Sequence, residues 1–467
     1  MATVLRGELE AAALALAFAA LLSIGRRSDV AFAAGEDLPQ SGRGLRRGRA
    51  GVELQDLYFE SCTFNLQCMN PRRRRASEAL ARMLKTFPAV LVYGPRQCGK
   101  TTLVRSALPT WLHVDLERPA DASLLQADLQ GWLETHWRRV AIDEAQRLPE
   151  LFPALRYALD ARGGRGRVVL LGSASPSLLS SVSESLAGRV GLLELTPFLA
   201  AELTGTKAGG DRWFWGGFPR VHQIRGHRSR SEWLDDYVTT VLERDLPALG
   251  VRLPATRLRL LVQMLTHVHG NLVNTSDLAR SLGVSPPTVA HDLDVLEGVF
   301  LIRRLPPYFV NIQKRLTKRP KLYIRDTGLL HLLAGLRKPP ELPVWARRGA
   351  SFEGLVVEEI AALARERAVR AGLFFWRTAA GAEVDLLIQN GQQLVPIEIK
   401  LGAAVDPRSL QGLRQCMADL GIRKGWVVTA TGRRTRLGRD IELVPWSDVV
   451  ERRCDFGIGA RRAGKFR

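Results

Sequence analysis

The sequence predicts an α/β fold: a parallel sheet with helices on both faces, then a helical segment, then a second α/β domain. Between residues 89 and 195, short apolar runs typical of buried strands alternate with helical stretches, a pattern that favours a parallel sheet. A glycine-rich stretch joins the first of these strands to a helix. Further along, two segments with period-two alternation flank an Asn-Gly turn signal and predict the second sheet.

The glycine-rich stretch at residues 94–102 has the spacing of a phosphate-binding loop, because two glycines stand five positions apart before Lys-Thr. The glycines let the backbone curl so that successive N–H groups converge on phosphate oxygens. Lys100 is expected to reach the β- and γ-phosphates and Thr101 to bind Mg²⁺ at a helix N-terminus. We therefore expect ATP and Mg²⁺ as cofactors. The predicted nucleotide-binding residues are Gly94, Pro95, Arg96, Gln97, Cys98, Gly99, Lys100, Thr101 and Thr102.

Two later strands end in further candidates for this site. The run at residues 140–144 ends in Asp143, expected to hold Mg²⁺ through water, and Glu144, expected to act as general base on the attacking water. The run at residues 168–173 ends in Ser173, a candidate sensor of the γ-phosphate, with a plain helix cap as the alternative. Parallel strands bring such residues to one edge of the sheet, where the nucleotide is expected.

Two arginines compete for the role of an arginine finger. Arg189 closes a helical stretch before the last apolar strand and is a candidate to contact the γ-phosphate of its own or a neighbouring subunit. Arg244, in the run Leu-Glu-Arg-Asp, is the competing candidate. For both, simple pairing with a carboxylate is the alternative.

Composition points to a polyanionic partner. The chain has 467 residues and a formal net charge of +20, which makes nucleic acid, most plausibly DNA, a candidate partner. A solvated arginine-rich surface is the alternative explanation. The five cysteines have neither metal-binding nor disulfide spacing, which fits a reducing, cytoplasmic location.

The first 68 residues have no pattern that would join a core. The apolar run at residues 11–24 is too short to span a bilayer comfortably, so we expect no stable membrane span. Residues 31–33 resemble a leader-peptidase site, but Glu8 and Glu10 cancel the positive charge that a signal peptide needs. Residues 35–67 are rich in Gly and Arg, and we expect disorder. We interpret residues 1–68 as a dispensable, over-extended gene model, with a genuine signal or anchor as the alternative.

The middle of the chain predicts a winged helix-turn-helix. Residues 275–285 contain a helix, a glycine turn and a serine cap, and two prolines open the next helix. That second helix carries acidic residues, the wrong sign for a DNA groove, so packing or protein contact is favoured over base reading; these are Asp292, Asp294 and Glu297. The better DNA-contact candidates follow in an expected hairpin: Arg303, Arg304, Lys314, Arg315, Lys318, Arg319 and Lys321.

The C-terminal third carries a second set of carboxylates. Residues 383–389 and 394–400 alternate as strands around Asn390-Gly391. A two-residue turn places Asp385 opposite Pro396, and a four-residue turn places it opposite Glu398; in both registers Asp385, Glu398 and Lys400 share a face. Glu353, on an upstream helix, is expected to join them. Such a cluster can bind Mg²⁺ and activate water for phosphodiester cleavage; a solvated strand face is the alternative.

These residues carry a resemblance to a family. From about Met69 onward the chain resembles bacterial and archaeal predicted AAA-type P-loop ATPases that carry a winged-helix segment and a C-terminal domain similar to restriction endonucleases and Holliday-junction resolvases. The resemblance implies ATP binding, ATP hydrolysis and a nuclease-like fold. The matching segments are residues 94–102, 142–146, 172–173, 186–189, 242–245, 325–329, 352–353, 383–385 and 397–400.

The expected organisation has six parts, and three functions remain open. The parts are an extension (1–68), a P-loop ATPase core (69–205), a helical linker or lid (206–254), a winged helix-turn-helix (255–345), a restriction-endonuclease-like domain (346–450) and a basic tail (451–467). ATP turnover either drives DNA remodelling with cleavage, or switches a C-terminal domain that only binds nucleic acid or protein, or serves a regulator whose winged helix reads an operator. A homo-oligomer is compatible with each function.

Overall fold

The computed structural model describes residues 74–136, 138–173, 182, 184–248, 250–251, 253–309, 319–367 and 371–458. By contacts the chain divides into two units, Met1–Cys68 and Met69–Arg467. The expectations for residues 1–68, for the end of the basic tail and for Lys314, Arg315 and Lys318 lie outside the described residues. None of the helices in the described part is both long and apolar enough to cross a membrane.

Five parallel strands form the first sheet, in the order β2-β3-β4-β1-β5. They are β1 (Ala89–Gly94), β2 (Leu112–Asp115), β3 (Val140–Asp143), β4 (Val168–Ser173) and β5 (Val190–Glu194). The helices around them are α3 (Ala76–Thr86), α4 (Lys100–Ala107), α5 (Pro119–Ala127), α6 (Leu129–His136) and α7 (Leu151–Arg162). This is the arrangement of the P-loop NTPase fold, and it confirms the predicted parallel sheet.

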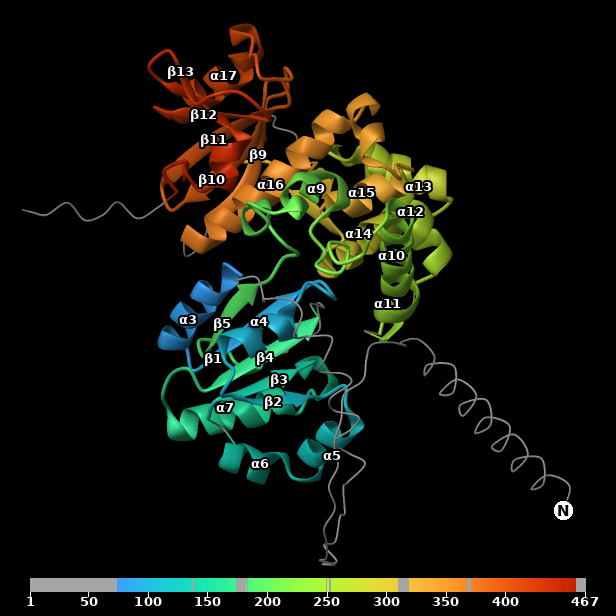
Figure 1. Ribbon diagram of the computed structural model, residues 1–467, viewed down its shortest axis with the longest axis vertical. Helices are drawn as coiled ribbons and strands as arrows, with labels where there is room; N and C mark the ends of the chain where they lie inside the picture. Colours follow the sequence, from blue (N-terminus) through green and yellow to red (C-terminus); the bar gives the residue numbers. More distant parts are fainter. Residues whose placement is uncertain are drawn as a thin grey trace, which may run out of the picture. The chain divides into compact units, whose positions relative to one another are not determined.

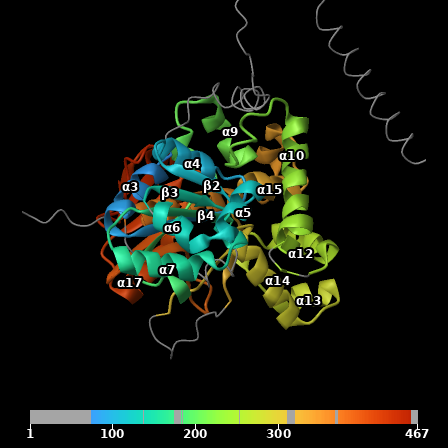
Figure 2. The ribbon, with the colours of Figure 1, turned by 90° about the horizontal axis from the view of Figure 1, so that it is seen from below.

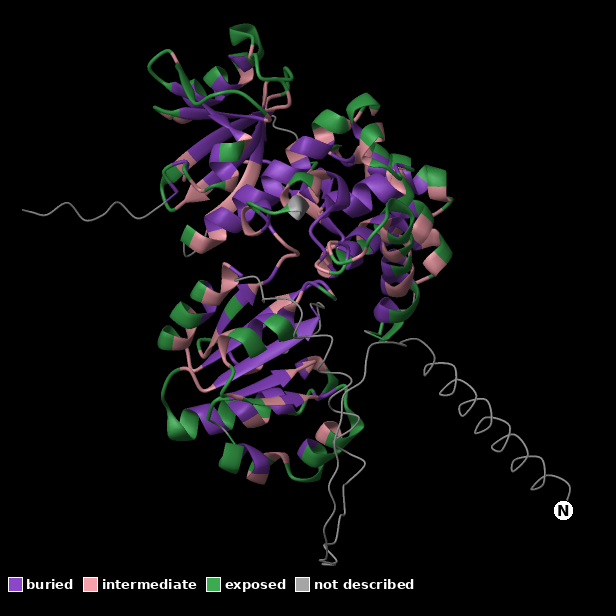
Figure 3. Ribbon diagram, in the orientation of Figure 1, coloured by how far each residue is buried: buried purple, intermediate pink, exposed green. Residues whose placement is uncertain are grey.

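The alternation of β1 explains why helices cover both faces of this sheet. Leu91 packs with Phe152 of α7 in one apolar cluster, which α5 and α6 complete. Val90 and Val92, which point to the opposite face, pack with Leu103 of α4 and with α3 in another cluster. In Figure 1, α3 and α4 accordingly lie on one side of the sheet and α7 on the other. Every residue of β4 is buried, as Figure 3 shows for the strands of this sheet.

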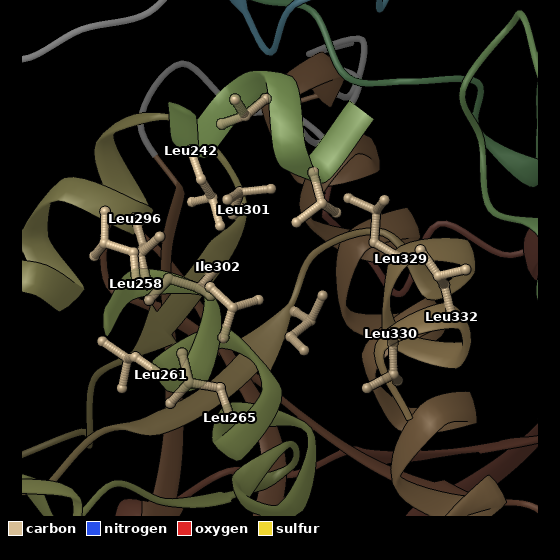
Figure 4. Packing of buried hydrophobic residues seen from close by; sticks show 14 of the residues in the cluster. Leu242, Leu258, Leu261, Leu265, Leu296, Leu301, Ile302, Leu329, Leu330 and Leu332 are labelled. Atoms are coloured by element: carbon tan, nitrogen blue, oxygen red, sulfur yellow. The ribbon is translucent and has the colours of Figure 1, made fainter. Parts of the chain in front are cut away.

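Helices dominate the middle of the chain. They are α9 (Lys207–Trp215), α10 (His227–Thr240), the π-helix η3 (Val241–Asp245), α11 (Leu246–Ala248), α12 (Ala255–Val268), α13 (Thr275–Leu282), α14 (Pro286–Gly298) and α15 (Thr327–Leu333). A three-stranded antiparallel sheet joins them, with β8 (Lys321–Ile324) between β6 (Asn271–Leu272) and β7 (Ile302–Leu305). Helices α12, α13 and α14 lie side by side in Figures 1 and 2. Leucines of α12 and α15 fill the core of this part (Figure 4).

The turn between α13 and α14 forms where its residue types predict it. Gly283 ends α13 in the left-handed conformation, with a φ of 65°, which glycine adopts without steric cost. The Ser285 side chain then caps α14 by accepting a hydrogen bond from the Thr288 backbone N–H at 3.3 Å. A helix-turn-helix pair followed by a small sheet is therefore present.

The acidic residues of α14 are neutralised within the protein. Asp292 is fully buried, and both of its oxygens accept hydrogen bonds from the Arg257 guanidinium, at 2.9 and 3.0 Å. Asp294 and Glu297 both pair with Arg304 of β7 at 2.6 Å. The acidic helix is thus held by packing inside its own chain.

Three of the expected DNA-contact residues point into the protein. Arg304 is held by α14, and Arg303 pairs with Glu358 at 2.5 Å. Lys321 is only 2% exposed. The prediction that these three contact DNA is wrong, because each is already bound by a carboxylate of this chain. Arg319 is exposed, and for it the prediction stands.

A mixed six-stranded sheet forms the C-terminal part, in the order β13-β14-β12-β11-β10-β9. The strands are β9 (Ala371–Arg377), β10 (Glu383–Asn390), β11 (Gln393–Lys400), β12 (Gly425–Thr429), β13 (Thr435–Leu437) and β14 (Ile441–Pro445). Helix α16 (Arg348–Arg367) packs on one face, α17 (Gln411–Leu420) covers the other, and α18 (Trp446–Val450) follows β14. The predicted second α/β sheet is therefore also present.

A buried ion-pair junction connects the three parts. Arg325, directly after β8, donates to Glu194 at the end of β5 at 2.6 Å and to Glu358 of α16 at 3.0 Å. Arg303 also binds Glu358, and Arg365 lies 3.4 Å from Glu194. Burial alone would raise the pKa of Glu194, but the Arg325 and Arg365 guanidinium groups outweigh it and lower this pKa to about 2.

Glu194→Gln is expected to lower the free energy of unfolding at neutral pH. The unfolding free energy of the variant should also fall less steeply on acidification than that of the unmodified protein. The folded-state pKa of Glu194, about 2, lies below its ordinary value of 4.5. The stabilisation by its charge is therefore complete above that ordinary value and is lost as the pH falls toward the folded-state value. Urea unfolding at about pH 6 should show a deficit on the order of 3 kcal/mol in the variant. The deficit should shrink between about pH 5 and about pH 3.

Glu232→Gln is the matched control, because it removes a carboxylate that is 57% exposed and pairs with Arg228 on the surface. Exposed pairs contribute little to stability, so this variant should follow the unmodified protein at every pH. A Glu194→Gln deficit that stays constant down to about pH 3 would contradict the assignment of Glu194 as a charged junction residue.

Candidate functional site: a nucleotide-binding loop and a carboxylate cluster

The loop from β1 to α4 requires glycine at both of its marked positions. A Cβ on Gly94 would lie 2.1 Å from the Leu195 carbonyl oxygen, so no side chain fits there. Gly99 has a φ of 96° in the left-handed region, where side chains are strained. The loop thus passes tightly over the chain that leaves β5, which is the reason for the glycine spacing read from the sequence.

The buried Arg74 hydrogen-bonds to the backbone of the loop. Arg74 donates to the Cys98 carbonyl oxygen at 2.9 Å and to the Thr196 carbonyl oxygen at 2.6 Å. Cys98 is fully buried in the apolar cluster under α4, and burial raises the pKa of its thiol. The role of Cys98 is therefore packing.

The predicted phosphate and magnesium ligands converge at the carboxyl edge of the sheet. Lys100 is buried, and its Nζ donates to the Pro95 and Gly94 carbonyl oxygens at 2.9 and 3.2 Å. The Thr101 hydroxyl donates to Asp143 Oδ2 at 2.5 Å. Two oxygen ligands from separate segments thus meet at one point, and such ligands suit Mg²⁺.

Glu144 and Ser173 lie at the same edge. Glu144 follows β3 in the left-handed conformation, and its carboxylate accepts a hydrogen bond from the Gln146 amide. Ser173 stands beside Gly94 in the pairing of β4 with β1. It is buried, and its hydroxyl has no hydrogen-bond partner among the described residues. An orphaned hydroxyl beside the loop, together with the Thr101 and Asp143 oxygens, fits a bound nucleotide with Mg²⁺.

Arg189 lies at the opposite edge of the sheet. Its carbonyl oxygen accepts a hydrogen bond from the Ala89 N–H, at the start of β1, whereas the phosphate-binding loop follows the end of β1. Six residues of strand separate the two edges, about 17–20 Å. The guanidinium binds Asp160 through two hydrogen bonds, at 2.5 and 2.8 Å. This position contradicts a contact with the γ-phosphate of its own subunit; a contact in a neighbouring subunit stays a prediction.

The π-helix η3 places Arg244 near the loop instead. Its neighbour Asp245 accepts a hydrogen bond from Arg96 of the loop at 2.5 Å, and the Tyr237 hydroxyl donates to the Arg96 carbonyl oxygen at 3.4 Å. Burial raises the pKa of Asp245, and the nearby charge of Glu144 adds to this effect. Arg244 itself is exposed. No sequence pattern singled out Tyr237, and Asp245 was noted only as part of the run Leu-Glu-Arg-Asp at residues 242–245. A π-helix has no clear residue signature, although it is frequent at functional sites.

The C-terminal carboxylates come together as expected. Strands β10 and β11 are paired from Asn390 with Gln393 to Leu386 with Ile397. Extended by one residue, this register places Asp385 opposite Glu398, which is the second of the two expected registers. Asp385 Oδ2 accepts a hydrogen bond from the Ile399 N–H at 2.9 Å. The pairing of β10 with β9 shifts between Val384 and Leu387, where Asp385 lies. Such irregularities are common beside functional sites.

Lys400 and Glu398 form a direct pair. Lys400 Nζ donates to Glu398 Oε1 at 2.6 Å, while Glu398 Oε2 is buried with no hydrogen-bond partner among the described residues. Burial and the charge of Asp385 raise the pKa of Glu398 to about 8. The Glu398 carboxylate is enclosed by the protein, whereas Lys400 is partly exposed; the enclosure of Glu398 and Asp385 contradicts the alternative of a solvated strand face.

An unexpected residue, Lys321, occupies the centre of the cluster. Its Nζ donates to Glu353 Oε1 and to Asp385 Oδ1, both at 3.0 Å, and also pairs with Glu383. The Tyr323 hydroxyl donates to the same Glu353 oxygen at 2.5 Å. Burial opposes the charge of Lys321, but Tyr323 and the surrounding carboxylates outweigh it and hold the pKa of the ammonium well above its ordinary value.

The cluster does not fit a metal ion in this arrangement. Within the residues that the structure describes, no group of three or more His, Cys, Asp or Glu side chains is placed to hold a metal. The Lys321 ammonium takes the position between Glu353 and Asp385 that the expected Mg²⁺ would need. The sequence carried no signal for this contact, since the basic hairpin favoured a DNA surface.

Comparison with protein-family models assigns most of the described chain from residue 86 onward to three domains. Residues 86–204 match a family described as an AAA domain, and residues 208–340 and 348–449 match two domains of unknown function, DUF8612 and DUF4143. The Walker-type ATPase PABY2304 of Pyrococcus abyssi is similar in structure with a TM-score of 0.39 and 16% identity, over 56% of this chain and 95% of that one.

Two mycobacterial relatives match most of the chain. The uncharacterized proteins Rv2008c of Mycobacterium tuberculosis and Mb2031c of Mycobacterium bovis are each 40% identical to it over 391 residues, which is 83% of this chain and 87% of the relative. The chain belongs to the same family as these two proteins, and it contains an AAA domain with a complete phosphate-binding loop.

Proposed function

We propose that this protein hydrolyses ATP with Mg²⁺ and that ATP turnover controls a C-terminal domain that binds nucleic acid. The observation that carries the first part is the hydrogen bond between Thr101 and Asp143, with Glu144 and the orphaned Ser173 hydroxyl at the same edge of the sheet. Oxygen ligands, a phosphate-binding lysine and a carboxylate base are the parts that phosphoryl transfer to water requires.

Each residue of this site has a definite role in the proposed reaction. Lys100 leaves the Pro95 and Gly94 carbonyl oxygens and neutralises the β- and γ-phosphates. Thr101 and Asp143 would hold a magnesium ion, which would supply charge neutralisation at the phosphates. Glu144 accepts the proton of the attacking water, and Gln146 holds the Glu144 carboxylate in place by its hydrogen bond. Ser173 donates to the γ-phosphate or to the water.

Lys100→Ala is expected to abolish nucleotide binding, because the charge that neutralises the phosphates is lost. Glu144→Gln is expected to retain binding while turnover falls by about 10²-fold or more, because only the base is removed. Fluorescent-nucleotide titration and phosphate release measure the two effects. Hydrolysis at the unmodified rate in Glu144→Gln would show that another group activates the water.

Arg244→Ala is expected to lower turnover by up to about 10³-fold with little change in nucleotide affinity, because an arginine finger acts mainly in the transition state. Arg189→Ala is its matched control, since both remove an exposed or half-exposed arginine and Arg189 lies at the far edge of the sheet. Equal activity of Arg244→Ala and the unmodified protein would exclude Arg244. A loss confined to Arg189→Ala would assign the finger to a neighbouring subunit, and thus to a homo-oligomer.

The domain boundaries expected from the sequence complete this proposal. The ATPase core (69–205) and the lid (206–254) meet at the phosphate-binding loop through Arg96 and Asp245. The segment 255–345 carries β8, whose following residue Arg325 binds the core and α16. A change at the end of β5 therefore has a direct path to the domain at 346–450. The requirement for ATP and the three buried free thiols among the described residues support a cytoplasmic location.

Exposed arginines next to β13 support binding to nucleic acid, with DNA as the proposed partner. Arg433, Arg436 and Arg439 are exposed, and none of them has an ion pair within the described residues. The adjoining loop reaches the chain that follows β11, because a Cβ on Gly432 would lie 3.9 Å from Ala403. Arg433 thus borders the end of the sheet where Lys400 lies, whereas Arg439 lies in the turn between β13 and β14, near the opposite edge. Phosphates bind to such a surface mainly by releasing counterions.

Replacement of these three arginines by alanine is expected to weaken DNA binding by about tenfold or more and to make it less dependent on salt. Fluorescence anisotropy with a labelled duplex, a single strand and a branched DNA at several salt concentrations gives both quantities. Arg228→Ala is the control, because it removes an arginine of α10 whose side chain is 92% exposed. Unchanged binding in the triple variant would move the DNA site elsewhere, and no binding at all by the unmodified protein would favour a protein partner.

A further inference from the structure

Lys321 is the buried cation that the proposed ATPase does not use. It comes from β8, whereas the carboxylates around it come from α16 and β10. Its side chain is 3% exposed. We propose that Lys321 is an internal counter-cation that occupies the place of a divalent metal ion, so that the carboxylate site of the C-terminal domain is closed to metal while β8 is in position.

The distances support exclusion of a metal ion by the ammonium group. Lys321 Nζ lies 3.0 Å from an oxygen of Glu353 and 3.0 Å from an oxygen of Asp385, and it also contacts Glu383. A divalent ion would have to stand about 2.0–2.6 Å from the same oxygens. Two cations within this space would repel each other strongly in the dry interior. The lysine and a metal ion therefore compete for the same carboxylates.

The cluster without Lys321 has the chemistry of a divalent-cation site. Glu353, Asp385 and Glu398 supply only carboxylate oxygens, which Mg²⁺, Mn²⁺ and Ca²⁺ prefer. Glu398 is 6% exposed, and its Oε2 has no hydrogen-bond partner among the described residues. An acceptor oxygen that is buried and unused is costly and indicates a ligand position that the lysine does not fill.

Strand β8, which carries Lys321, is also linked to the ATPase core. Lys321 and Tyr323 point to the same face of β8, and both bind Glu353 of α16. Arg325 follows on that face and binds Glu194 at the end of β5. Withdrawal of Lys321 therefore requires movement of a strand that the ATPase core helps to hold. The closed site does not depend on ATP hydrolysis, so metal binding and turnover are tested by separate measurements.

The test measures Mn²⁺ binding to the full-length, nucleotide-free protein by electron paramagnetic resonance. Lys321→Met keeps the length of the side chain and removes its charge, and it is expected to bind one additional Mn²⁺ at least about tenfold more tightly than the unmodified protein. Lys321→Met/Asp385→Asn should lose that additional ion. Any Mn²⁺ held at Thr101 and Asp143 is common to all variants and cancels in the comparison.

Lys321→Met leaves buried carboxylates without a counter-ion and is expected to melt at a lower temperature in the absence of metal. Added Mn²⁺ should raise the melting temperature of Lys321→Met by more than it raises that of the unmodified protein. Failure of Mn²⁺ to stabilise the variant, or to bind it, would overturn the proposal. A second measurement needs no Lys321 variant: if Asp385→Asn alone removes a Mn²⁺ ion from the otherwise unmodified protein, the site is open in the presence of Lys321 and the proposal is wrong.

Discussion

The buried pairing of Arg325 with Glu194 and Glu358 is the constraint on which the rest of the structure depends. All three side chains are at most 12% exposed, so each charge would be costly without its partners. The end of β5, the strand β8 and the helix α16 must meet for the charges to be neutralised. Because the chain leaving β5 passes directly over Gly94, the same constraint bears on the phosphate-binding loop.

Side chains on one face of β8 bind carboxylates of α16. Lys321, Tyr323 and Arg325 alternate along the strand, and they bind Glu353 and Glu358 of the helix. This arrangement explains why Lys321 does not contribute to a DNA surface: it neutralises carboxylates within the chain. The net positive charge that remains for a partner is carried by other arginines, among them those beside β13.

The two candidate sites differ in whether a cation of the protein already occupies them. At the nucleotide site, the Thr101 and Asp143 oxygens are near one another, and the Ser173 hydroxyl has no hydrogen-bond partner among the described residues. At the carboxylate cluster, a cation of the protein itself is already bound.

The sequence by itself determined the features that depend on neighbours along the chain. The loop at residues 94–102, the strands of both sheets and the cap of α14 follow from steric and hydrogen-bonding preferences that act over a few residues. Tertiary structure alone decided the place of Lys321, the removal of Arg189 to the far edge of the sheet, and the pairing of Arg96 with Asp245. It also selected the hairpin register that sets Asp385 opposite Glu398. The Arg96–Asp245 pair joins residues 149 positions apart, so no local pattern encodes it. Lys321 lies among its carboxylates because a buried charge must find its counter-charge wherever packing brings one.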